Sequence, residues 1–245
     1  MSPAMWVSLA EAATLEVGPN AAFQSVQAAI DEALDGDRIE VQPGIYPGRV
    51  VLGRTELEVV STDGPAVTTL VPETDYLYSP AVVRVDGPAL VTLRGFTIDG
   101  RGVSRGLEVL AAELHGSDLR VWGGLDLNLD IAESTVTLED SFLGPAVGTS
   151  PAHGVVSTSN VTFERVTFAK GRAGYAGGAL TLRRGSSVFR HCTFADNEAA
   201  VGGALYAEGE EASTTIEDSV FERNVAWSGY GGAIHQYGGA LTLLR

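Results

Sequence analysis

The stretch GGALYAEGEEASTTIEDSVFERN, from Gly202 to Asn224, opens with a Gly-Gly-Ala-Leu motif and closes with Phe-Glu-Arg-Asn. Both motifs recur at similar spacing: GGAL also starts at Gly177, GGAI starts at Gly231, and FADN spans 194–197. Self-similarity with a period of about 20–50 residues is typical of solenoids, in which each repeat stacks on the one before it. The stretch therefore predicts one turn of a repeating fold.

The same period continues back along the chain in pairs of apolar residues that lie five positions apart. The pairs are Leu93/Ile98, Leu114/Leu119, Leu138/Leu143, Phe163/Phe168, Phe189/Phe194 and Ile216/Phe221. Between the members of each pair we expect a second inward residue: Phe96, Ser117, Ser141, Val166, Cys192 and Ser219. Just before it we expect a tight bend, for which Gly and Asp are suited: Gly95, Gly116, Asp140, Arg165, His191 and Asp218. The pattern indicates a coil whose short strands pair in parallel with the turns above and below.

Turn residues predict a structural ladder along this coil. Asn197 and Asn224 each follow the last core Phe of their repeat by three residues, and stacked asparagines can hydrogen-bond each other and the backbone. The first glycines of the repeated pairs, Gly177, Gly202 and Gly231, let the chain swing into the next strand without a Cβ clash.

One helix is expected, at the start of the chain. In NAAFQSVQAAIDEAL (20–34), Asn20 is the expected N-cap and Gly36 the stop. The apolar residues of its buried face recur at three- and four-residue spacing: Phe23, Val26, Ile30, Ala33 and Leu34. After the helix the pattern changes to period two, as in strands.

These segments resemble a known family. The entry FQSVQAAIDEALDGDRIEVQPGIYPGRVVL (23–52) is similar to the entry of right-handed parallel β-helix proteins of the pectin-lyase-like superfamily. The GGA[LI] and FxxN repeats resemble those of polymorphic outer-membrane and autotransporter passenger proteins. The resemblance implies an all-β fold, a right-handed single-stranded parallel β-helix with an N-terminal capping α-helix, over residues 14–245. It does not imply one activity, because the superfamily contains lyases, hydrolases, esterases, epimerases and adhesins.

The charge of the chain argues against a nucleic-acid partner. The formal net charge is −15 and the 16 Lys and Arg residues form no basic run, whereas phosphate binding needs clustered cations. No apolar run reaches the roughly 18–20 residues of a transmembrane helix. The single cysteine, Cys192, is expected to be a packed small hydrophobe.

Both ends of the sequence leave questions open. MSPAMWVSLAEAATLEVG (1–18) is apolar and contains an Ala-x-Ala-like AEA, but it lacks a basic residue. It is either an export-signal remnant over residues 1–13 or an ordinary N-terminal strand. The sequence stops within a strand-like run, GGAIHQYGGALTLLR (231–245), so we expect further repeats, a domain or a subunit to cover that end of the coil.

A calcium site is one interpretation of GLDLNLDIAE (124–133). If its four apolar residues alternate inward, Asp126, Asn128 and Asp130 share the outward face, and calcium prefers such oxygen ligands. The alternative is a solvated polar face. No cofactor is required by the sequence, and Ca²⁺ is the only candidate.

Weak glycan-binding candidates lie in two loops and near the C-terminal end. Asp99 and Arg101, with Arg105 nearby, either bind a sugar acid or form a solvated Asp-Gly turn. Tyr76 and Tyr78 either stack on a glycan or cover the flank of the coil. The aromatic group near the C-terminal end forms either a binding surface or, as we prefer, part of an interface with further rungs: Trp227, Tyr230, His235 and Tyr237.

Catalytic motifs of the superfamily are absent from the sequence. It has no adjacent Asp pair with a Gly-His-Gly, no Arg-x-Pro-x-x-Arg, and none of the glutamine and Asp-Phe elements of pectin methylesterases. We therefore expect a secreted or outer-membrane-associated β-helix acting as a rigid adhesion or structural module, with polysaccharide or another surface protein as partner. The alternatives are a polysaccharide lyase or glycoside hydrolase that uses Asp126 and Asp130, and a non-catalytic glycan-binding module.

Overall fold

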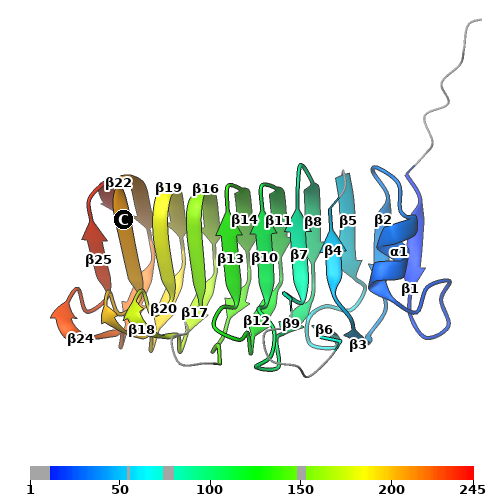
Figure 1. The fold of residues 1–245 in the computed structure, drawn as a ribbon, viewed down its shortest axis with the longest axis horizontal. Helices are drawn as coiled ribbons and strands as arrows, with labels where there is room; N and C mark the ends of the chain where they lie inside the picture. Colours follow the sequence, from blue (N-terminus) through cyan, green and yellow to red (C-terminus); the bar gives the residue numbers. More distant parts are fainter. Residues whose placement is uncertain (1–11, 54–55, 74–79, 148–152) are drawn as a thin grey trace, which may run out of the picture.

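The protein is a right-handed parallel β-helix of about 9 turns, as a computed structural model shows (Figure 1). The structure describes residues 12–53, 56–73, 80–147 and 153–245. Every strand pair recorded among them is parallel, so each turn is hydrogen-bonded to the turns before and after it. The chain therefore returns to the same lateral position once per turn, as the repeat predicts.

Three sheets run along the coil. The large one contains β1 Thr14–Val17, β2 Arg38–Val41, β4 Val50–Leu52, β5 Glu56–Ser61, β7 Val83–Asp86, β8 Leu90–Arg94, β10 Leu107–Leu110, β11 Glu113–Ser117, β13 Leu129–Ala132, β14 Thr135–Glu139, β16 Gly154–Glu164, β19 Leu180–Arg190, β22 Leu205–Glu217, β25 Ile234–Tyr237 and β26 Ala240–Leu244. The second contains β3 Gly44–Pro47, β6 Thr68–Val71, β9 Thr97–Asp99, β12 Arg120–Trp122, β15 Phe142–Leu143, β17 Thr167–Ala169, β20 Thr193–Ala195 and β23 Val220–Glu222. The third contains β18 Arg172–Ala176, β21 Glu198–Val201 and β24 Val225–Tyr230.

The helix α1 spans Val26–Glu32 and lies at the N-terminal end of the coil (Figure 1). Its N-cap is Ser25, whose side chain accepts a hydrogen bond from the amide of Ala28, so the expected N-cap at Asn20 is wrong. Leu34 lies beyond the helix and is 66% exposed, which also corrects its place on the buried face. Val26, Ala29 and Ile30 do join the core. That the helix acts as a cap stays a prediction.

The strand register corrects the predicted alignment in one turn, where it was shifted by two residues. The aligned inward residues are Leu93, Gly116, Leu138, Phe163, Phe189 and Ile216, followed by Ile98, Val121, Leu143, Phe168, Phe194 and Phe221. Gly116 and Val121, rather than Leu114 and Leu119, therefore belong to these two columns. Leu114 and Leu119 are nevertheless buried, because a shift of two residues keeps a strand residue on the same face.

The bend column is confirmed at five of its six positions. Gly95, Asp140, Arg165, His191 and Asp218 all have left-handed backbone angles. In the remaining turn the left-handed residue is Asp118, at φ 49°, and not Gly116. The inward residue after it is accordingly Leu119 instead of Ser117.

The core contains the stacked aromatic rings that the repeat predicts. Ring centroids are 5.1 Å apart for Phe163 and Phe189, 4.8 Å for Phe168 and Phe194, and 4.4 Å for Phe194 and Phe221, all close to parallel. Cys192 is buried beside them, and burial raises the pKa of its thiol to about 11. It is a packed core residue, as expected.

The predicted ladder residues are also in place. The Nδ2 of Asn197 donates to Oδ1 of Asn224 (2.9 Å) and to the carbonyl oxygen of Phe168 (3.0 Å). Gly177, Gly202 and Gly231 have φ of 62°, 60° and 59°, and a Cβ on each would collide with a carbonyl oxygen three residues later. These corners bring the third sheet back to the large one. In the described part of the chain, no helix is long and apolar enough to cross a membrane.

Candidate functional site

A column of charged side chains stands on the outer face of the large sheet. Arg84, Glu108 and Asp130 are in register on β7, β10 and β13, each at the centre of an apolar-x-apolar triplet. Because neighbouring strand residues point to opposite faces, the flanking apolar residues fill the core and these three side chains point outward. Parallel strands lie about 4.8 Å apart, so the three side chains are immediate neighbours.

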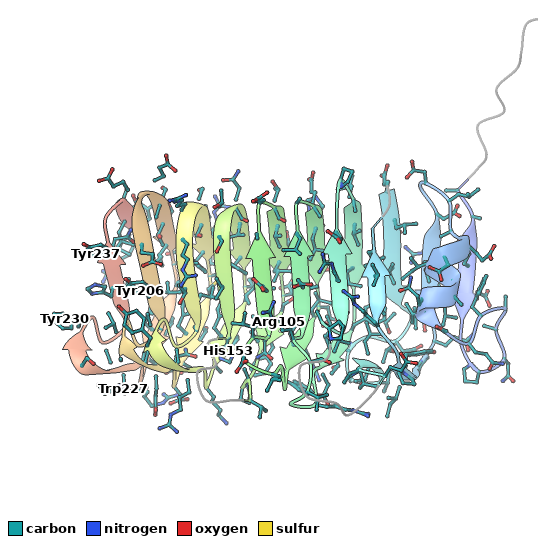
Figure 2. The ribbon with its side chains drawn as sticks, viewed as in Figure 1. Arg105, His153, Tyr206, Trp227, Tyr230 and Tyr237 are labelled. Carbon is teal, nitrogen blue, oxygen red and sulfur yellow. The ribbon has the colours of Figure 1, made fainter. Side chains whose placement is uncertain are left out.

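Arg105 joins this column from the loop before β10. Its Nη1 lies 2.7 Å from Oδ2 of Asp130 and 3.3 Å from Oε1 of Glu108. The other oxygen of Glu108 is 2.9 Å from Nη1 of Arg84. We name Arg84, Arg105, Glu108 and Asp130 the central cluster; Figure 2 shows Arg105 over the middle turns of the coil.

Arg84, Arg105 and Glu108 of the central cluster line a surface cavity of about 400 Å³, which we name the central cavity; Asp130 lies beside it, paired with Arg105. Its lining residues are Arg49, Pro80, Ala81, Arg84, Val103, Arg105, Glu108, Leu125 and Asp126. The Nε of Arg49 is buried and has no hydrogen-bond partner among the described residues. Three arginines and two carboxylates, Glu108 and Asp126, thus line this cavity. Arg84 and Arg105 are already paired with carboxylates, so Arg49, which enters no ion pair among the described residues, is the cation there that favours an anionic ligand.

The two carboxyl groups of the cluster lie in different surroundings. Glu108 contacts two guanidinium groups and its side chain is only 12% exposed. Asp130 contacts one, and burial raises its pKa; Arg105 opposes that shift and the charge of Glu108 adds to it. Two neighbouring carboxyl groups, one of them with a raised pKa, are the arrangement that acid–base hydrolysis uses.

Other ion pairs between turns serve as a comparison. Arg165 binds Asp140 at 2.6 Å and Arg223 binds Asp196 at 2.6 Å, and in each case the arginine lowers the pKa of the carboxyl. The Asp140 side chain is 55% exposed, whereas that of Asp130 is 22% exposed. Pairs of that exposed kind are screened by solvent and contribute little to stability. Asp130 is therefore more buried than Asp140, and its pKa is raised whereas the pKa values of Asp140 and Asp196 are lowered. It also lies beside a cavity.

The predicted calcium ligands do not share a face. Asn128 is fully buried: its Oδ1 accepts from the amide of Gly124 (2.8 Å) and its Nδ2 donates to the carbonyl oxygen of Gly144 (2.6 Å). Strand β13 begins only at Leu129, so the expected alternation does not extend back to residue 125. Asp126 lies in the preceding loop with a φ of 63° and lines the central cavity, while Asp130 pairs with Arg105. Among the described residues, no group of three His, Cys, Asp or Glu side chains is arranged to hold a metal ion.

The predicted glycan-binding residues are not brought together in one place. Oδ1 of Asp99 accepts a hydrogen bond from the amide of Arg101 (2.9 Å), and Arg101 is exposed with a φ of 51°. This is the local turn that the sequence left as the alternative, although it does not test glycan binding. Arg105, from the same loop, reaches the central cluster. Tyr76 and Tyr78 lie outside the described residues.

Sequence reasoning missed Arg49, Arg84 and Glu108. A usable signal was present in the triplets Val-Arg-Val (83–85), Leu-Glu-Val (107–109) and Leu-Asp-Ile (129–131), each with a charged residue between two core residues. Aligning these triplets would have placed the three charges in one column. Arg49 carries no such signal, because it precedes its strand.

Comparisons with known proteins give the fold and no closer relation. No family model and no curated protein sequence matches the chain. A pectin methylesterase from Aspergillus niger matches with a TM-score of 0.65 at 13% identity, over 93% of this chain and 85% of that one. The pectin methylesterase PemA from Erwinia chrysanthemi matches with a TM-score of 0.59 at 10% identity, over 93% and 80%. Escherichia coli ybhc matches with a TM-score of 0.63 at 12% identity, over 98% and 87%.

Proposed function

We propose that the protein is a polysaccharide-active hydrolase that acts on a carboxylate-bearing glycan chain, with Glu108 and Asp130 as its catalytic pair. The observation that carries the proposal is the pairing of these two carboxyl groups on one guanidinium, at the edge of a cavity lined by three arginines. The structural likeness to pectin methylesterases is compatible with it, but at 10–13% identity that likeness bears on the fold alone.

Each group has a distinct role in this proposal. Asp130, whose pKa is raised, is the general acid that protonates the leaving oxygen of the substrate. Glu108, held by Arg84 and Arg105, is the ionised carboxylate that acts as nucleophile or stabilises developing positive charge. The guanidinium group of Arg49, which lines the cavity, and the donors of Arg105 that its two ion pairs leave free bind carboxylates of the substrate. Calcium has no part in this scheme.

The test is a screen of purified protein against acidic and neutral polysaccharides, with new reducing ends, released acid and released alcohol as readouts. These readouts distinguish cleavage of a glycosidic bond from cleavage of an ester. We expect product from an acidic polysaccharide, and a loss of at least about 100-fold in kcat/KM in Asp130→Asn and in Glu108→Gln.

The matched control is Asp140→Asn, which breaks an arginine–aspartate pair of the same kind outside the cavity. It should retain wild-type activity. If no substrate gives product, or if the Asp130 and Glu108 variants remain active, the proposal is wrong. The adhesive rod and the non-catalytic glycan-binding module would then be the better interpretations.

A further inference from the structure

A cluster of aromatic rings lies on the same face of the coil as the central cluster, toward its C-terminal end (Figure 2). Tyr206 and His235 are stacked with centroids 5.6 Å apart and an interplanar angle of 3°. Tyr230 meets His235 edge-on at 6.1 Å, and Tyr175 meets Tyr206 edge-on at 6.4 Å. We name these four side chains the aromatic platform.

The fold builds the platform from two sheets. Tyr206 on β22 and His235 on β25 occupy successive outward positions of the large sheet. Tyr175 and Tyr230 lie on the third sheet, in β18 and β24, close to the Gly177 and Gly231 corners. Because these left-handed corners return the third sheet to the large one, they bring the rings of both sheets together.

The platform and the central cluster belong to one column of outward residues. The register runs from Glu108 through Asp130, Val155 and Thr181 to Tyr206. Asp130 and Tyr206 are three turns apart, or about 14 Å at the usual strand spacing of about 4.8 Å. Thr181, between them, is buried and donates to the carbonyl oxygen of Ala176, so a ligand that reaches both sites passes over the exposed ring of Tyr175 rather than along the strand surface.

The exposure of these rings points to a ligand with flat rings and hydroxyl groups. Tyr175, in the first strand of the third sheet, is 74% exposed, and its edge-on contact with Tyr206 fixes the orientation of its ring. A tyrosine offers a sugar ring an apolar face and a polar hydroxyl at its edge. Among the described residues, every Tyr or Trp with an exposed side chain lies between positions 175 and 237.

A second cavity adjoins the platform and carries cationic groups. It has a volume of about 460 Å³ and is lined by Ser157, Thr158, Arg183, Arg184, Glu208, Gly209 and Tyr237. The hydroxyl of Tyr206 donates to Oε2 of Glu208 (3.1 Å), which connects the platform to this cavity. Arg183 pairs with Glu208 at 2.8 Å, whereas Arg184 enters no ion pair among the described residues and suits a glycan chain that carries carboxylates.

We propose that the aromatic platform is a second binding site for the polysaccharide, which stacks its sugar rings there while another part of the same chain occupies the central cavity. The inference rests on the proposed function for the identity of the ligand, but it requires binding only and not catalysis. A chain that spans both sites gains affinity over one that fills either site alone, because the second contact is intramolecular.

The experiment measures the affinity of an oligogalacturonide series, from disaccharide to decasaccharide and longer, by calorimetry. Asp130→Asn serves as background, so that binding is read without turnover. The platform variant is Tyr175→Ala combined with Tyr230→Ala, both exposed side chains whose loss leaves the core intact. The control is Trp227→Ala, which removes a half-exposed aromatic ring from the third sheet outside the platform.

We expect the platform variant to weaken binding of the long chains about tenfold and to leave the shortest ones within about twofold. The control should bind all lengths like its parent. Equal affinity of parent and platform variant for long chains, an equal loss for short and long chains, or an equal loss in Trp227→Ala would each overturn the inference. Length-dependent binding that needs the platform, together with no turnover by the wild-type protein, would contradict the proposed function and leave the platform standing.

Discussion

At the scale of single residues, His153 and Asp130 show how burial changes the pKa of a side chain in this coil. His153 is fully buried and in register with Asn128 one turn before it, with Nδ1 of His153 3.3 Å from Nδ2 of Asn128. Burial lowers the pKa of His153 to about 4. Asp130 is shifted the other way, toward its neutral form. In both groups burial favours the uncharged form; in Asp130 a neighbouring carboxylate adds to the effect.

The first prediction concerns the dependence of stability on pH. The folded-state pKa of His153 lies below its ordinary value of 6.5, so the unfolded chain binds the proton more tightly. The stabilisation is therefore complete above pH 6.5 and is lost as the pH falls toward about 4. Between pH 7 and pH 5 the free energy of unfolding should fall by about 2 kcal/mol from this group.

Chemical denaturation of wild type and His153→Asn at both pH values measures this loss. Asn stands at the equivalent position 128, so the variant retains a buried polar group of a kind the coil accepts. The difference between the two proteins isolates His153 from the carboxylates. An equal loss of stability in both would show that His153 is not the group responsible.

The second prediction concerns Asp130 and can be tested without a substrate. Carboxyl ¹³C titration by NMR should place the pKa of Asp130 above the ordinary aspartate value and the pKa values of Asp140 and Asp196 below it. Glu108→Gln removes a like charge and should lower the pKa of Asp130. Arg105→Gln removes an opposite charge and should raise it. Shifts in the opposite directions would remove the basis for Asp130 as the general acid.

At the scale of the element, the corners between sheets depend on backbone conformations that few side chains allow. Gly202 has a φ of 60°, and a Cβ there would collide with the carbonyl oxygen of Leu205. The bends of the other corner accept Asp, Arg and His with similar φ. The glycine corners are therefore limited by space as well as by φ, which explains why the Gly-Gly motif repeats.

The third prediction follows from that difference. Gly202→Ala should destabilise the protein by more than about 1 kcal/mol, because the left-handed conformation costs about 1–2 kcal/mol and the collision adds to it. Gly232→Ala is the control, since a Cβ at Gly232 would meet no atom within 4 Å. Thermal or urea unfolding of the two variants compares them. A loss of the same size in both would refute the steric argument.

At the scale of the whole molecule, the charge around the central cavity differs from the net charge of the chain. Three arginines line the cavity together with two carboxylates, Glu108 and Asp126, and Arg84 and Arg105 also pair with Asp86 and Asp130. The chain carries a net charge of −15, yet Arg49, Arg84 and Arg105 line one cavity. An acidic polysaccharide is thus repelled at long range and attracted at short range. Salt weakens mainly the long-range repulsion, because it screens the partly buried charges of the cavity much less than the exposed charges of the surface.

The fourth prediction is an unusual salt dependence of association. Raising the ionic strength from about 0.01 M to about 0.15 M shortens the screening length from about 30 Å to about 8 Å, so the association rate with polygalacturonate should rise severalfold. Surface plasmon resonance or stopped-flow fluorescence measures it. A neutral polysaccharide of similar length is the control and should show no change. A rate for polygalacturonate that falls with salt would mean that the arginines act at long range.

The coil could be predicted from the sequence alone. The apolar pairs, the left-handed bends, the asparagine ladder and the glycine corners recur because every turn must place the same backbone at the same corner. The one error of register, at Leu114 and Leu119, was a slip of two residues. A period-two pattern cannot detect such a slip, because it leaves inward residues inward.

The candidate site depends on contacts between turns, which the sequence does not show. Glu108 follows Arg84 by 24 positions and Asp130 follows Glu108 by 22, so the three become neighbours only when the turns stack in register. The predicted row of Asp126, Asn128 and Asp130 is contiguous in sequence but divides among a loop, the interior and the outer face. In a parallel β-helix, groups that meet come from adjacent turns, so chemistry is determined by register between turns rather than by spacing along one strand.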